Sequence, residues 1–155
     1  MESTIINFFH LLGAVIWIGG ALYIHLILMP ALKAIDPQEG GKLQGIIAKR
    51  FSIVAWSSIV VLIITGLLKT PSAMLLNTTT HFGVILFIKH IFILGAIFVG
   101  LMIALNAVPN LRKNAPKPGE KPSAGFFKYQ KRLHTLALTN LIFALLILVL
   151  ASMLW

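Results

Sequence analysis

The stretch FFHLLGAVIWIGGALYIHLILMPAL, residues 8–32, decides the fold of this chain. It is longer than the roughly 20 apolar residues that an α-helix needs to cross about 30 Å of hydrocarbon. It also carries two histidines, His10 and His25, and ionisable groups inside a membrane are costly and usually functional. The stretch therefore predicts a membrane-spanning helix with a site built on it.

Comparable apolar segments follow, and the chain as a whole is 58% hydrophobic with a mean hydropathy of +0.93. Only α-helices and closed barrels satisfy every backbone group in lipid, and the alternating ten-residue pattern of barrel strands is not seen here. The sequence predicts an all-α fold, an integral membrane four-helix antiparallel bundle in one transmembrane domain. We expect the helices over about residues 5–32, 51–68, 82–107 and 133–154. The first segment is longer than a secretory signal and lacks a basic leader, so we expect it in the mature protein.

Basic residues outnumber acidic ones by 13 to 4, and they gather in residues 33–50 and in a Pro/Gly-containing linker, residues 112–132. Lys and Arg accumulate in cytoplasmic loops. The pattern therefore predicts a multi-pass protein of the cytoplasmic (inner) membrane with both termini on the outer side. The charges lie at membrane ends rather than among aromatic side chains along a groove, which argues against a nucleic-acid partner. Glycine-bearing helix faces would allow a homodimer.

Four histidines sort into two levels in this topology. His10 and His90 fall in the outer half of the first and third helices, whereas His25 and His134 fall near the inner ends of the first and fourth. In an ideal α-helix, His10 and His25 are about 22 Å apart along the axis and about 60° apart around it. Each therefore has a partner from another helix at its own depth.

Two level-matched pairs of imidazoles suit two bis-histidine haem b groups, since neutral histidine is an axial ligand of haem iron and helix bundles hold cofactors between facing side chains. The chain has no cysteine, so thiolate ligands and iron–sulfur clusters are excluded. The leading hypothesis is a membrane cytochrome b that passes electrons across the bilayer, linked to a quinone or another redox partner. No catalytic residue is assigned, because paired carboxylates and hydrolase triads are both missing.

Other residues fit around such haems. Trp17 would pack on the outer macrocycle, and the cations Lys89, Arg50 and Arg132 would bind propionates. Simpler interpretations stay open: a membrane histidine that only hydrogen-bonds to a hydroxyl or carbonyl, a Lys89 that snorkels to the interface, and basic clusters that only set topology.

The residues also resemble a known family. FHLLGAVIWIGGALYIHLILMPAL, RFSIVAWSSIVVLIITGL from Arg50 and HFGVILFIKH from His81 are similar to helices of the CopD-like (copper resistance protein D) membrane proteins. This resemblance implies copper transport or copper resistance as the alternative function, with copper bound by histidine and methionine.

The layout is similar as well to HemJ, a four-helix haem-containing protoporphyrinogen oxidase family. His10, Trp17, Tyr23 and Lys89 stand at positions that match its first and third helices. KRLHTLALTN replaces the Asn-Glu-x-Pro pattern of its fourth helix, and His25 stands near a family arginine. The resemblance implies one haem with an open coordination position, whereas the additional histidines favour a second haem.

Overall fold

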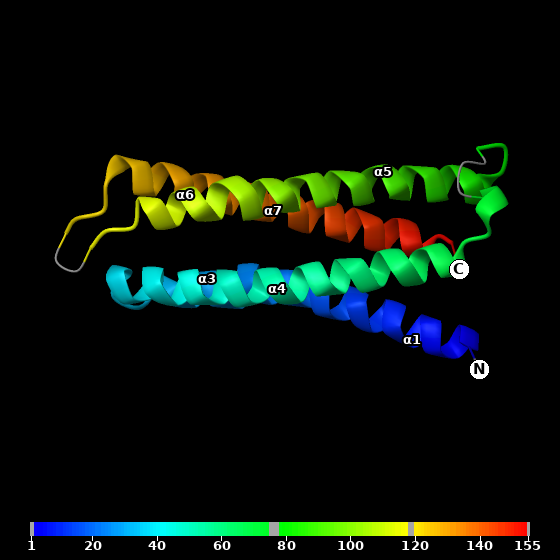
Figure 1. Ribbon diagram of the computed structural model, residues 1–155, viewed down its shortest axis with the longest axis horizontal. Coiled ribbons are helices and arrows are strands. Elements are labelled where there is room, and N and C mark those ends of the chain that lie inside the picture. Colours follow the sequence, from blue (N-terminus) through cyan, green and yellow to red (C-terminus); the bar gives the residue numbers. More distant parts are fainter. Residues whose placement is uncertain (1, 75–77, 118–119, 155) are drawn as a thin grey trace. The chain divides into compact units, whose positions relative to one another are not determined.

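The computed structural model describes residues 2–74, 78–117 and 120–154, and within them it contains helices, turns and coil but no strand. Four helical spans are long and apolar enough to cross a membrane: Ser3–Leu32, Glu39–Lys69, His81–Lys113 and Ala124–Ser152. They confirm the predicted all-α, four-helix membrane fold. The chain divides into two compact units, Met1–Gly83 and Val84–Trp155, and each holds two long helices side by side (Figure 1).

The first unit is an antiparallel hairpin of two helical spans. Its first span comprises α1 (Glu2–Ala14), η1 (Val15–Gly19), α2 (Gly20–Tyr23), η2 (Ile24–Leu28) and α3 (Met29–Leu32), and its second span is α4 (Pro37–Lys69). A β-carbon placed on Gly13 would lie 3.2 Å from Leu62 Cγ and 3.3 Å from the Ser58 carbonyl oxygen. This glycine therefore lets the two backbones approach closely, as small residues do between membrane helices.

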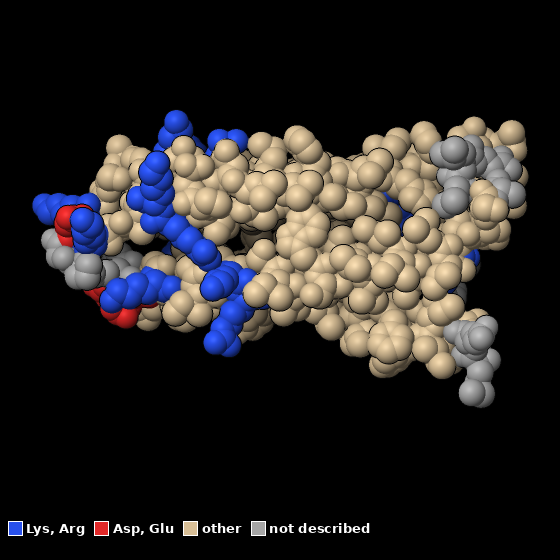
Figure 2. Space-filling view, in the orientation of Figure 1, with Lys and Arg blue, Asp and Glu red and all other residues tan. Residues whose placement is uncertain are grey.

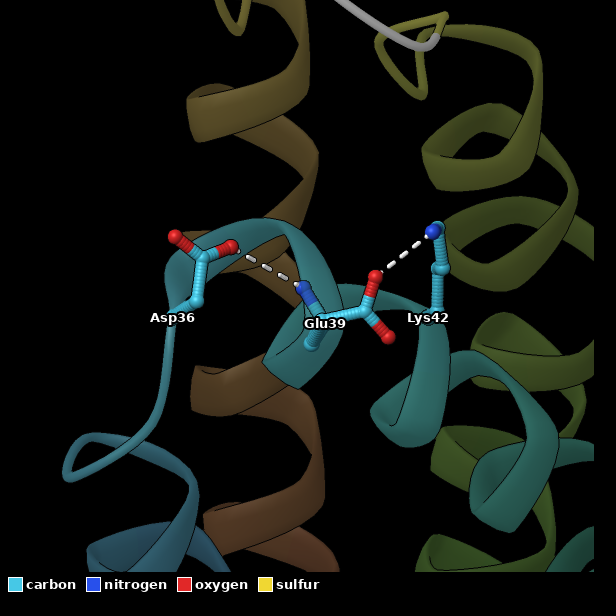
Figure 3. Close-up of polar contacts among 3 residues, drawn as sticks. All are labelled: Asp36, Glu39 and Lys42. Atoms are coloured by element: carbon cyan, nitrogen blue, oxygen red, sulfur yellow. Dashed lines mark hydrogen bonds and ion pairs between the residues drawn. The ribbon is translucent and has the colours of Figure 1, made fainter.

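The α4 helix begins at Pro37 rather than at Phe51, where the apolar segment starts. Asp36 Oδ1 accepts a hydrogen bond from the Glu39 N–H at 3.3 Å, and Lys42 Nζ pairs with Glu39 Oε1 at 2.7 Å (Figure 3). An aspartate cap, a proline in the first position and an acidic first turn all favour helix initiation. The helix therefore also includes most of the basic segment that precedes its apolar part.

The second unit contains α5 (His81–Met102) from Val84 onward, η4 (Ile103–Ala107), α6 (Val108–Lys113) and α7 (Ala124–Ser152). Ser123 Oγ caps α7 by accepting the Phe126 N–H at 3.1 Å, so this helix begins at Ala124 rather than near residue 133. The predicted linker, residues 112–132, is consequently helical at both of its ends. Gly95 lies against the Phe143 ring, which brings α5 and α7 together in antiparallel register.

Each unit has a wide π-helical turn directly before a proline. The Met29 N–H donates to the Ile24 carbonyl, five residues back, in η2, and the Val108 N–H donates to the Ile103 carbonyl in η4. Pro30 and Pro109 follow these turns as the second residue of a short α-segment. Proline has no N–H and its ring clashes with the carbonyl four residues back, and a wider turn accommodates both effects. The first helix thus continues past Pro30 to Leu32.

Most lysines and arginines of each unit lie toward the end where its hairpin turns (Figure 2), whereas Lys69 ends α4 and Lys89 lies on α5. In the first unit Lys33, Lys42, Lys49 and Arg50 are all exposed. In the second unit the same holds for seven side chains: Arg112, Lys113, Lys117, Lys121, Lys128, Lys131 and Arg132. Each unit therefore has one strongly basic end, as the sequence predicts.

Candidate functional site

His10 lies on α1, half-buried, against the facing helix α4. Its Nδ1 is 2.7 Å from the hydroxyl oxygen of Thr65, a residue that is only 7% exposed. The ring also lies over Gly66, where a β-carbon would come 3.6 Å from His10 Cε1. Two neighbouring residues of α4 thus determine where the imidazole sits.

The hydrogen bonds around Thr65 determine which nitrogen of the neutral His10 ring carries the proton. Thr65 Oγ1 donates to the Val61 carbonyl oxygen at 2.6 Å, and a hydroxyl has only one proton to donate. Toward His10 it must therefore accept, so the proton is on Nδ1. The lone pair is then on Nε2, the nitrogen that can bind a metal ion.

His25, in η2, reaches the same state by a different contact. Its Nδ1 is 3.0 Å from the Ala21 carbonyl oxygen. A carbonyl only accepts, so Nδ1 again carries the proton and Nε2 the lone pair. Metal-binding histidines commonly donate their other ring N–H to a carbonyl or a side chain, which orients the ring and raises its basicity. Both histidines of the first helix have this arrangement.

The π-helical turn η1 changes the angle between these two histidines. A π-helical turn contains about one more residue than an α-helical turn, so everything beyond η1 is rotated back by about 100°. The ideal separation of about 60° becomes about 40° in the opposite sense, and the separation along the axis stays on the order of 20 Å. His10 and His25 therefore still share one broad face of the helix.

Three polar atoms of the second unit are buried and lack a hydrogen-bond partner among the described residues: His90 Nδ1, Asn106 Oδ1 and Asn140 Oδ1. Leaving such an atom unsatisfied costs about 1–3 kcal/mol, and a ligand or an ordered water commonly removes the cost. His90 lies on α5 and is half-buried, whereas His134 on α7 is exposed. The two predicted haem pairs, His10 with His90 and His25 with His134, each join a histidine of the first unit to one of the second. Both pairs stay a prediction.

The other predicted site residues lie in different environments. Trp17 is 6% exposed within η1, and Lys89 is half-buried on α5. Arg50 and Arg132 are exposed at the basic ends of α4 and α7. Across the part of the chain that the structure describes, no three His, Cys, Asp or Glu residues gather closely enough to hold a metal ion.

Sequence reasoning missed Thr65 and the Ala21 carbonyl. Thr65 is a hydroxyl-bearing residue within a long apolar run, which is the only local signal it offers. Its contact with His10 joins residues 55 positions apart. No spacing rule within one helix reveals such a pair.

A family model for CopD, copper resistance protein D, matches residues 45–154. The chain belongs to the copper resistance protein D family. Searches of curated proteins and of solved structures found no match. The region that matches the CopD model contains Thr65, Lys89, His90 and His134, whereas helix one, with His10 and His25, precedes it.

Proposed function

We propose that this copper resistance protein D family member binds copper ions within the membrane and passes them across it, with Nε2 of His10 and of His25 as ligands. The observation that carries the proposal is the hydrogen bonding of these two rings. Nδ1 of His10 donates to Thr65, and Nδ1 of His25 donates to the Ala21 carbonyl. Imidazole nitrogen is a suitable ligand for copper.

The sparse ligand set agrees with transit rather than storage. The chain has no cysteine, and no cluster of three or more His, Cys, Asp or Glu residues is present in the described ranges. Conduction requires sites that bind well enough to admit an ion and weakly enough to release it. Two histidines on the order of 20 Å apart along one helix supply successive binding positions.

Copper binding and uptake by purified protein in vesicles test the proposal. His10→Ala and His25→Ala should each lower the copper bound per chain and slow its uptake. His81→Ala is the matched control, because His81 is an exposed histidine at the start of α5. Wild-type uptake in both single variants would overturn the proposal.

The distribution of charges supports a topology for the chain. We infer that the basic ends of both units face the cytoplasm and that both termini face outward, because Lys and Arg are enriched on the cytoplasmic side of membrane proteins. In this orientation His10 lies toward the outer surface and His25 toward the inner one. Copper moving between them would follow the first helix.

A second candidate function, a membrane cytochrome b, is favoured by His90. Its Nδ1 is buried without a hydrogen-bond partner among the described residues. Coordination to haem iron is one way in which a buried imidazole is satisfied. In this proposal His10 pairs with His90 and His25 with His134 as axial ligands of two haems. Trp17 packs on the outer haem, and Lys89, Arg50 and Arg132 bind propionates. When bound, such haems supply one-electron transfer, to a quinone or a redox partner.

An absorption spectrum of the purified protein separates these functions. Two haems per chain with sharp reduced α-bands support the cytochrome, and one high-spin haem supports a HemJ-like oxidase. A colourless protein that binds copper supports the copper function. In the cytochrome proposal, His10→Ala and His90→Ala must remove the same haem.

A further inference from the structure

We propose that Thr65 is a positioning residue, which fixes the tautomer and the orientation of the His10 ring and thereby sets Nε2 as its metal-binding atom. The inference deepens the proposed copper function and rests on it for the role of Nε2. The assignment of Thr65 itself rests on hydrogen bonds alone, so it can be tested in metal-free protein.

The Thr65 hydroxyl joins two helices. It donates to the Val61 carbonyl of its own helix at 2.6 Å, and it accepts from His10 Nδ1 of the facing helix at 2.7 Å. The next carbonyl within reach, that of Leu62, is 3.4 Å away, so the Val61 bond is clearly preferred. A threonine that donates back to a helix carbonyl keeps its lone pairs available for a donor on a neighbouring helix.

Burial makes this arrangement rigid. Thr65 is 7% exposed, so water has little access to compete for its hydroxyl. A buried polar pair that is fully satisfied specifies one arrangement, because every alternative leaves a polar atom without a partner. If the His10 ring carried its proton on Nε2 instead, Nδ1 and the Thr65 oxygen would face each other as two acceptors at 2.7 Å.

Gly66 leaves room beside the ring edge. The position of a β-carbon on Gly66 is 3.6 Å from His10 Cε1, and no other atom outside its local backbone comes within 4 Å among the described residues. The ring edge at Cε1 therefore lies at ordinary van der Waals distance from this position.

The test compares three substitutions. Thr65→Val removes the hydroxyl and keeps the branched shape, whereas Thr65→Ser keeps the hydroxyl and removes the methyl. Thr70→Val is the matched control, because Thr70, one residue beyond α4, donates to the Gly66 carbonyl of that helix at 2.9 Å. Circular dichroism and thermal melts show whether each variant is folded.

Nitrogen-15 NMR of histidine-labelled, metal-free protein reads the tautomer directly, with the His10 signals assigned by their loss in His10→Gln. Wild type, Thr65→Ser and Thr70→Val should show a protonated Nδ1 and an unprotonated Nε2. Folded Thr65→Val should lose this single state. The same spectrum in wild type and Thr65→Val would overturn the proposal, and so would a Thr65→Ser variant that behaves like Thr65→Val.

Titration with Ag(I), a closed-shell analogue of Cu(I), gives the consequence for binding. Loss of a hydrogen-bond partner behind a metal ligand typically lowers metal affinity about 10–100-fold, and we expect this loss for Thr65→Val only. If wild type shows the expected tautomer but binds neither silver nor copper, the copper function fails while the assignment of Thr65 stands. If silver binds equally well to wild type and Thr65→Val, Thr65 does not position the ligand.

Discussion

Replacing Gly13 by alanine tests the close packing of helix one against α4 that places His10 beside Thr65. The new methyl group would lie 3.2 Å from Leu62 Cγ and 3.3 Å from the Ser58 carbonyl oxygen. Carbon atoms pack best at about 3.5–4.0 Å, so the two helices must separate by a few tenths of an ångström. The carbonyl belongs to backbone and cannot rotate away.

The magnitude follows from two opposing effects. Overpacking a tight contact typically costs about 1–3 kcal/mol, whereas alanine is favoured over glycine within a helix by about 0.8–1.0 kcal/mol. We expect Gly13→Ala to lower the free energy of unfolding by about 0.5–2 kcal/mol. Denaturant titration in mixed micelles, followed by circular dichroism, measures this difference.

Gly19→Ala provides the matched control, because among the described residues a β-carbon on Gly19 would have no neighbour within 4 Å beyond its adjacent residues and its local helix backbone. Only the helix preference then acts, so this variant should be stabilised by up to about 1 kcal/mol. Equal unfolding free energies for Gly13→Ala and Gly19→Ala would refute the packing argument. A Gly13→Ala variant more stable than wild type would do the same.

Three further experiments have definite expected outcomes. Ser123→Ala removes the cap of α7 and should cost about 0.5–2 kcal/mol of unfolding free energy, whereas Ser123→Asp should retain most of it; equal melts for both variants would argue against the cap. Lys42→Ala breaks an ion pair whose side chains are 58% and 65% exposed, and its melting temperature should stay close to wild type at any salt concentration because exposed pairs contribute little. Since the chain has no cysteine, single cysteines at the exposed Ser72 and Ser123 report topology. A membrane-impermeant thiol reagent should label Ser72→Cys from outside and Ser123→Cys only in inverted vesicles. Labelling of both positions from one side would contradict the inferred orientation.

The four membrane spans could be predicted from the sequence because burial in lipid requires long apolar runs, and the four observed spans confirm them. The starts of α4 and α7 could not be predicted in the same way. Residues 37–50 and 124–132 are polar and basic, so hydropathy does not distinguish an interfacial helix from a loop. The signals were local instead: Asp36 and Glu39 for α4, and Ser123 for α7.

The site was only partly predictable. His10 and His25 attract attention in any apolar helix, but the sequence does not say which ring nitrogen carries the proton. That depends on Thr65, 55 positions from His10, and on the Ala21 carbonyl. Proline at position 30 predicts a local disturbance of the helix, but the outcome, a widened turn followed by further helix, depends on how the backbone re-forms its hydrogen bonds.

X-ray absorption spectroscopy of the copper-loaded protein tests the copper proposal most directly, because it reports the atoms bound to copper. We predict imidazole nitrogen ligands in the wild type, reduced in His10→Ala and in His25→Ala and lost when both are replaced. An identical copper spectrum in the wild type and the double variant would contradict the proposal.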